Sequence, residues 1–138
     1  MNKKIKLSNF TIENNSDRLT LISGPCLLES DKMVYKVATK LSSLSKKYKF
    51  NLIFKCSFDK ANRTSHSSLR SKMSFNAAMD VLKSIKKDFK LSVTTDVHET
   101  SQISKLIEYI DVIQIPAFLS RQTDLIIAAA DTHKIVNV

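Results

Sequence analysis

The sequence predicts an α/β fold built on a parallel β-sheet. Short segments rich in β-branched residues alternate along the chain with segments of helical periodicity, as in repeated βα units. The strand segments are almost continuously apolar, which is typical of parallel strands covered on both faces. Two architectures fit this pattern, an open doubly wound sheet and a closed (β/α)8 barrel.

The expected elements follow in a regular order after a small hairpin within residues 1–14. Ser30 and Ser74 are predicted N-caps, because apolar residues at helical spacing begin just after each of them. We expect a single partial domain over residues 1–138. Strands are expected at residues 19–23, 51–56, 91–95, 111–115 and 134–138, and helices at 31–48, 75–89, 101–109 and 122–131.

Composition argues against several classes of protein. With 138 residues and 43% apolar content the chain suits one globular domain, and no apolar run approaches the roughly 20 residues that span a bilayer. Gly24 is the only glycine, so neither a dinucleotide fingerprint nor a P-loop can form, and no nucleotide cofactor is expected. The sequence opens without an export signal, which predicts a cytoplasmic protein whose Cys26 and Cys56 stay reduced.

The formal charge of +9 comes from residues 1–90, whereas residues 91–138 are net acidic. An excess of lysine can attract nucleic acid. Most of these lysines, however, fall on polar faces of the expected helices, where solvation is the ordinary explanation, and no aromatic platform for bases accompanies them. We therefore expect neither a nucleic-acid partner nor a membrane partner.

Polar side chains gather where the expected strands end, the edge at which parallel α/β folds form their active sites. Lys55, Asp96 and Gln114 lie at the ends of three successive strand segments. Cys26 follows the strand segment at residues 19–23, and His98 follows the one at residues 91–95. Cys26 fits a metal ligand, a nucleophile or a buried packing residue, and packing is favoured for a lone cysteine. His98 fits a ligand, a base or a hydrogen-bonded structural residue, and the structural role is favoured.

A long connection follows the strand segment at residues 51–56. Residues 57–73 exceed the usual length of a βα loop. They carry lysine, arginine and several hydroxyl side chains, a combination that suits a phosphate group. A solvated basic loop is the alternative.

Four motifs occur in order along the chain: SGPCLLES at residues 23–30, FKCSFDKANRTS at 54–65, TDVHE at 95–99 and DVIQIPAFLSRQTDL at 111–125. Together they resemble 3-deoxy-D-manno-octulosonate 8-phosphate synthase. The KANR run separates this resemblance from the related 3-deoxyheptulosonate 7-phosphate synthases, which carry a KPRTS-type motif there. The resemblance implies the N-terminal portion of a (β/α)8 TIM barrel whose bottom is plugged by the hairpin, within a homotetramer.

The resemblance also implies an activity, the condensation of phosphoenolpyruvate with arabinose 5-phosphate in the biosynthesis of the Kdo sugar of lipopolysaccharide. Its expected catalytic set is Lys55, Lys60, Asp96 and His98, of which the two lysines contact phosphoenolpyruvate. The other substrate contacts it implies are Asn62 for the sugar, Arg63 and Thr64 for the sugar phosphate of a neighbouring subunit, and Gln114 and Arg121 for the pocket wall.

Cysteine after Gly-Pro is found in the metal-dependent members of this family. The resemblance therefore implies a divalent transition metal with Cys26 as one ligand. The family's other metal ligands belong to a part that has no counterpart before Val138, as does a Lys-Lys motif with three further βα units. We expect the 138-residue chain alone to be inactive. The alternative is a non-catalytic remnant that binds phosphorylated ligands or a partner chain.

Overall fold

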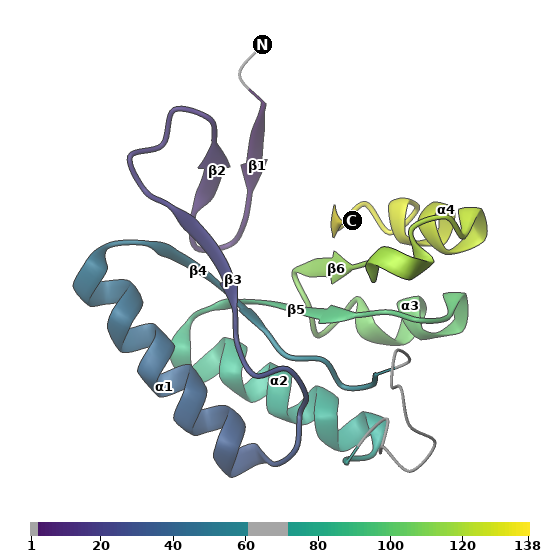
Figure 1. Ribbon diagram of the computed structural model, residues 1–138, viewed down its shortest axis with the longest axis horizontal. Helices are drawn as coiled ribbons and strands as arrows, with labels where there is room; N and C mark the ends of the chain where they lie inside the picture. Colours follow the sequence, from purple (N-terminus) through teal and green to yellow (C-terminus); the bar gives the residue numbers. More distant parts are fainter. Residues whose placement is uncertain (1–2, 61–71) are drawn as a thin grey trace.

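The structure is a computed structural model that describes residues 3–60 and 72–138. A parallel sheet in the order β3-β4-β5-β6-β7 forms the body, and β1 and β2 form a separate antiparallel hairpin. Figure 1 shows the helices following the strands in turn. The elements are β1 (Lys4–Lys6), β2 (Thr11–Glu13), β3 (Thr20–Ser23), α1 (Asp31–Tyr48), β4 (Asn51–Lys55), α2 (Phe75–Phe89), β5 (Ser92–Asp96), α3 (Thr100–Leu106), β6 (Val112–Gln114), η1 (Ala117–Leu119), α4 (Thr123–Ala130) and β7 (Ile135–Asn137).

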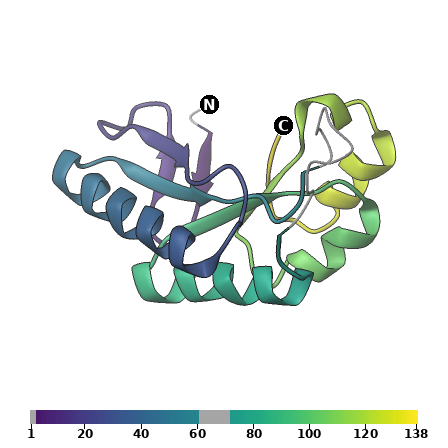
Figure 2. The same ribbon diagram turned by 60° about the horizontal axis from the view of Figure 1, so that its bottom comes forward.

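The barrel interpretation is confirmed over the open-sheet alternative. Each strand pairs in parallel with its neighbour in sequence, so the order never reverses as it does in a doubly wound sheet. The sheet curls, with α1 and α2 on its outer side and the hairpin on its inner side (Figure 2). The chain thus forms the first five strands of a (β/α)8 barrel.

The predicted N-caps are also confirmed. The Ser30 hydroxyl accepts a hydrogen bond from the Met33 amide at 3.3 Å, and the Ser74 hydroxyl accepts one from the Ala77 amide at 3.3 Å. Each bond satisfies an amide that has no partner within the first turn of its helix. These caps fix where α1 and α2 begin, and therefore where the loops above the sheet end.

In the part of the chain that the structure describes, three residues adopt left-handed backbone conformations that usually favour glycine. Lys49 and Lys90 end α1 and α2 with φ of 55° and 53°, and His133 precedes β7 with φ of 56°. The αL residue at the end of a helix allows the chain to turn into the next strand. Lysine takes this place twice in a chain whose only glycine is elsewhere.

The core has two layers, one on each face of the sheet. The outer layer fills the space between sheet and helices and contains Leu52, Phe54 and Leu82, each at most 2% exposed. The inner layer is smaller and packs Ile53 and Val112 against the hairpin. Asn9 fastens the hairpin, because its amide oxygen accepts a hydrogen bond from the Ser92 hydroxyl at 2.6 Å. The expected plug at the bottom of the barrel is therefore present.

The sheet is open at β3. Leu19, Leu21 and Ile22 are exposed there by 66%, 37% and 40%. Leu21 and Ile22 face opposite sides of the sheet, so both the outer and the inner apolar layers reach solvent at this edge.

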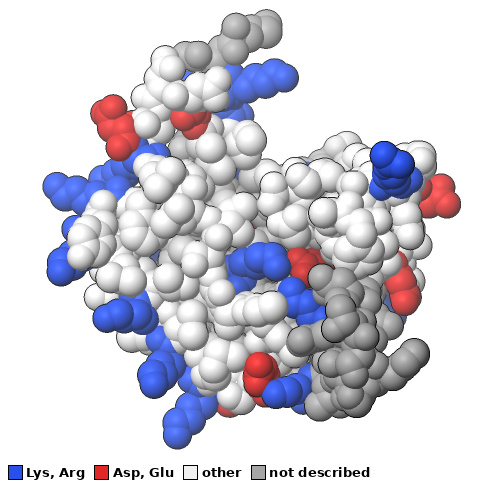
Figure 3. All heavy atoms as spheres, viewed as in Figure 1, with Lys and Arg blue, Asp and Glu red and all other residues white. Residues whose placement is uncertain are grey.

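The lysine excess lies largely on helix surfaces. Figure 3 shows lysine and arginine side chains along the margin that α1 occupies in Figure 1. Lys36, Lys40 and Lys83 are all exposed, as expected for solvated helix faces. Among the described residues, no helix is both long enough and apolar enough to cross a membrane.

Candidate active site at the carboxyl ends of the strands

The upper part of the inner sheet face is polar. Side chains alternate along each strand, and registered residues of parallel neighbours share a face. Lys55 pairs with Thr94, Asp96 pairs with Gln114, and Gln114 pairs with Asn137, so these residues from β4 to β7 face the barrel interior together. The sequence places them up to 82 positions apart, and the parallel register brings them to one edge.

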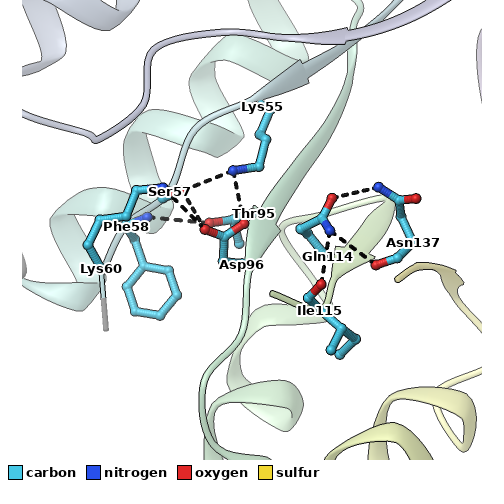
Figure 4. Close-up of polar contacts among 9 residues, drawn as sticks. All are labelled: Lys55, Ser57, Phe58, Lys60, Thr95, Asp96, Gln114, Ile115 and Asn137. Carbon is cyan, nitrogen blue, oxygen red and sulfur yellow. Dashed lines mark hydrogen bonds and ion pairs between the residues drawn. The ribbon is translucent and has the colours of Figure 1, made fainter. Parts of the chain in front are cut away.

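Asp96 lies at the centre of this edge (Figure 4). Its Oδ1 is 2.9 Å from the Lys55 ammonium, and its Oδ2 accepts a hydrogen bond from the Ser57 hydroxyl at 2.6 Å. Lys60 approaches the same Oδ2 at 3.5 Å. The structure therefore brings together three residues of the expected catalytic set, Lys55, Lys60 and Asp96.

The group is largely shielded from water. The Asp96 side chain is 9% exposed, that of Lys60 14% and that of Lys55 26%. Burial alone raises the pKa of Asp96, but hydrogen bonds from Ser57 and Lys55 and the charges of both lysines outweigh it and hold that pKa below the usual range. Asp96 is therefore ionised at neutral pH. One carboxylate between two ammonium groups leaves a net positive charge, which suits an anionic ligand.

Gln114 is held by the next strand. Its Nε2 donates to the backbone oxygens of Ile115 and Asn137 at 3.0 and 3.3 Å. Its Oε1 accepts a hydrogen bond from Asn137 Nδ2 at 2.6 Å. With both amide protons engaged, Gln114 can meet a ligand through its remaining oxygen lone pair.

The backbone around Lys55 is closely packed. A Cβ atom added at Gly24 would lie 1.8 Å from the Lys55 carbonyl oxygen. The Leu28 amide donates to the Ser57 carbonyl at 2.9 Å, and the Phe58 amide donates to the Thr95 hydroxyl at 3.4 Å. The backbone after β3 and the backbone of β4 thus approach so closely that glycine is required at position 24. The connection after β4 is hydrogen-bonded to the connection after β3 and to β5.

The sequence that builds this edge matches a known protein family. Residues 3–138 match the DAHP synthetase I family. The chain belongs to that family.

Three relatives of the chain bear the name 2-dehydro-3-deoxyphosphooctonate aldolase. The one from Mesorhizobium japonicum is 43% identical over 137 residues, which are 99% of this chain and 49% of the relative. Those from Wolinella succinogenes and Rhizobium meliloti are 46% and 45% identical over 87% and 91% of this chain and 45% and 44% of their own. The chain thus spans about half the length of these relatives.

Two further expected site residues, His98 and Arg121, lie in the part of the chain that the structure describes. The ring of His98 packs edge-on against Phe58 at 6.5 Å between centroids, and its backbone amide donates to Gln102. Arg121 is exposed in the turn before α4, and within the described residues no hydrogen bond or ion pair joins it to Lys55, Lys60 or Asp96. The expectations for Asn62, Arg63 and Thr64, and for most of the phosphate-binding loop, fall on residues outside those that the structure describes.

The favoured packing role of Cys26 is wrong. Cys26 is exposed, because β3 ends at Ser23 and Cys26 lies in the connection that leaves the sheet after it. Cys56, in contrast, is buried as expected, and burial raises the pKa of its thiol to about 12. In residues 3–60 and 72–138, no three His, Cys, Asp or Glu side chains are grouped so that they could hold a metal. Cys26 and its described neighbours therefore do not form a complete metal site, because tight transition-metal sites use three or four protein ligands.

Two residues at the site were not anticipated from the sequence. Ser57 bonds to the central carboxylate and Asn137 orients Gln114. Ser57 lies two positions after Lys55. If the alternation of side chains in β4 continues past the end of the strand, Ser57 and Lys55 lie on the same face. Asn137 has the same signal through its place in the last strand segment.

Proposed function

We propose that this chain supplies the phosphoenolpyruvate side of the active site of a 2-dehydro-3-deoxyphosphooctonate aldolase, a cytoplasmic transferase that condenses phosphoenolpyruvate with arabinose 5-phosphate and releases phosphate. The observation that carries the proposal is the convergence of Lys55 and Lys60 on the single carboxylate of Asp96. Phosphoenolpyruvate carries a carboxylate and a phosphate, and ammonium groups make strong charge-assisted hydrogen bonds to both. The names of the relatives and the KANR run at residues 60–63 support the octonate reaction over the heptulosonate reaction.

In this proposal each residue of the group has a distinct role. Lys55 and Lys60 bind the anionic groups of phosphoenolpyruvate. Asp96 holds the two lysine side chains at the inner face through its ion pairs, and as an ionised group it accepts rather than donates hydrogen bonds. A condensation of two phosphorylated substrates depends on their relative position, so fixed binding groups supply much of its rate.

Further assignments in this proposal rest on the resemblance in sequence. Asn62, Arg63 and Thr64 are assigned to arabinose 5-phosphate, and the assembly is assigned as a homotetramer. Cys26 is assigned as one ligand of a divalent transition metal whose other ligands come from outside residues 1–138. No step of the reaction is assigned to that metal.

A second candidate is a non-catalytic chain that binds phosphorylated ligands or a partner polypeptide. The observation that favours it is the exposure of Leu19, Leu21 and Ile22 along the edge of β3. Such an edge pairs readily with another strand. This candidate shares the anion site of the first and differs from it in lacking turnover.

Calorimetric titration of the purified chain with phosphoenolpyruvate tests the shared anion site. We expect weak binding that falls as the salt concentration rises, because ionic screening weakens exposed charge interactions. Lys60→Ala should weaken binding about tenfold, as expected for loss of one charge-assisted contact. Lys83→Ala, at an exposed lysine of α2, is the control and should bind as the wild type does. Equal binding by Lys60→Ala and the wild type contradicts the proposal.

A phosphate-release assay separates the two candidates. The chain alone should release no phosphate from the two substrates. After mixing with the C-terminal half of a related aldolase, release of phosphate supports the transferase. Binding of phosphoenolpyruvate without release in that mixture supports the non-catalytic candidate.

A further inference from the structure

The Ser57 hydroxyl connects the two charged groups at the centre of the site. Its oxygen is 3.1 Å from the Lys55 ammonium and 2.6 Å from Asp96 Oδ2 (Figure 4). Ser57 is fully buried, with 0% exposure. A buried hydroxyl between an ammonium and a carboxylate is fully used as both acceptor and donor.

The position of this hydroxyl is set by the backbone. The Ser57 carbonyl accepts a hydrogen bond from the Leu28 amide at 2.9 Å, and Leu27 and Ser57 form a parallel β-bridge. Ser57 therefore fastens the connection after β3 to the connection after β4, while its side chain reaches the end of β5. Three neighbouring strand ends are fixed relative to one another at this residue.

The protons at this residue can be assigned individually. Ionised Asp96 only accepts, so the single hydroxyl proton of Ser57 goes to Asp96 and the hydroxyl oxygen accepts a proton of Lys55. Lys55 gives a second proton to Asp96 Oδ1 at 2.9 Å. An ammonium has three protons, so among the residues that the structure describes one N–H of Lys55 has no partner and can meet a ligand.

The Ser57 hydroxyl and the Lys60 ammonium contact the same oxygen of Asp96. At 2.6 Å, Ser57 makes the short contact to Oδ2, and Lys60 lies at 3.5 Å from that oxygen, at the limit of a hydrogen bond. We propose that Ser57 is a positioning residue that directs the third N–H of Lys55 into the site, so that this ammonium group can bind phosphoenolpyruvate. The role in binding rests on the proposed function, whereas the geometry of the three charged groups does not.

The experiment compares Ser57→Ala, Ser57→Thr and Ser42→Ala in the full 138-residue chain. Ser42 is a buried serine of α1 and controls for the loss of any buried hydroxyl. Carboxyl-carbon NMR without ligand measures the pKa of Asp96, and calorimetry measures the affinity for phosphoenolpyruvate. Ser57→Ala should raise that pKa and weaken binding about tenfold, whereas Ser57→Thr keeps the hydroxyl and should stay within about threefold of the wild type. Ser42→Ala should change neither quantity.

The two readouts judge the inference and the proposed function separately. If Ser57→Ala leaves the pKa of Asp96 unchanged, the positioning role is overturned. It is also overturned if the wild type binds phosphoenolpyruvate and Ser57→Ala binds it with the same affinity. Should Ser57→Ala not fold, a Ser57→Thr chain that loses affinity to the same degree as Lys60→Ala overturns it as well. A wild type that binds no phosphoenolpyruvate contradicts the proposed function, and the Asp96 titration then decides the positioning role alone.

Discussion

Replacing Gly24 with alanine tests how tightly the chain is packed beneath the site. The new Cβ would lie 1.8 Å from the Lys55 carbonyl oxygen and 2.8 Å from its carbonyl carbon. Real Cβ contacts are essentially never under 3.0 Å, so the two backbone segments must separate by about 1.2 Å, the difference between 3.0 and 1.8 Å. Both neighbouring atoms belong to the backbone of β4 and cannot be relieved by rotation of a side chain.

The cost follows from three contributions. Overpacking costs about 1–3 kcal/mol. A displacement of this size also breaks the nearby 2.9 Å hydrogen bond from Leu28 to Ser57, which costs about 1 kcal/mol. Alanine restricts the unfolded chain and returns about 0.4–1 kcal/mol. We expect Gly24→Ala to lower the free energy of unfolding by about 2 kcal/mol.

Urea denaturation followed by circular dichroism measures this change. With a slope of about 2 kcal/mol per molar urea, the midpoint should fall by about 1 M. Ser23→Ala at the preceding residue is the control and should stay within about 0.5 kcal/mol of the wild type. A urea midpoint of Gly24→Ala equal to that of Ser23→Ala would refute the close approach of the Gly24 and Lys55 backbones.

Three further outcomes are expected. The buried Thr94 hydroxyl has no hydrogen-bond partner among the described residues, so Thr94→Val should stabilise the chain against urea by about 1 kcal/mol. Thr95→Val removes the hydroxyl that accepts from the Phe58 amide and should destabilise the chain. Changes in the free energy of unfolding that have the same sign for both variants would contradict this. Iodoacetamide at pH 8 should modify exposed Cys26 and spare Cys56, whose buried thiol has a pKa of about 12, and mass spectrometry showing two modifications would disprove it. Because the pKa of Asp96 is lowered in the folded chain, its contribution to stability is complete above the unfolded value of about 3.9 and is lost as the pH falls through the folded value. The free energies of unfolding of wild type and Asp96→Asn should therefore converge at acid pH, and a constant difference would count against the ion group.

Much of the fold could be predicted because its signals are local. Capping by Ser30 and Ser74 depends on the following few residues, and the observed helices begin where those caps indicate. Lys55 and Asp96 could be placed at one edge because parallel strands share their carboxyl ends. The boundaries differ by a few residues, and the short helix η1 after β6 was not expected.

The remainder depended on contacts between distant segments. Cys26 lies beyond the last paired residue of β3, where alternation no longer determines burial, so its exposure could not be derived from the strand pattern. The hydrogen bond from Ser57 to Asp96 joins residues 39 positions apart, and it depends on the path of the backbone after β4. Neither serine nor asparagine is rare enough in this sequence to mark Ser57 or Asn137 as a site residue.

The left-handed residues Lys49, Lys90 and His133 have a consequence for how this sequence can evolve. A side chain in that conformation costs about 1 kcal/mol relative to glycine. Three such positions together cost on the order of 3 kcal/mol, a sizeable part of the roughly 5–15 kcal/mol by which an ordinary domain is stable. A chain that adopts these conformations with side chains other than glycine therefore has less margin left, and each further destabilising substitution should bring it closer to unfolding.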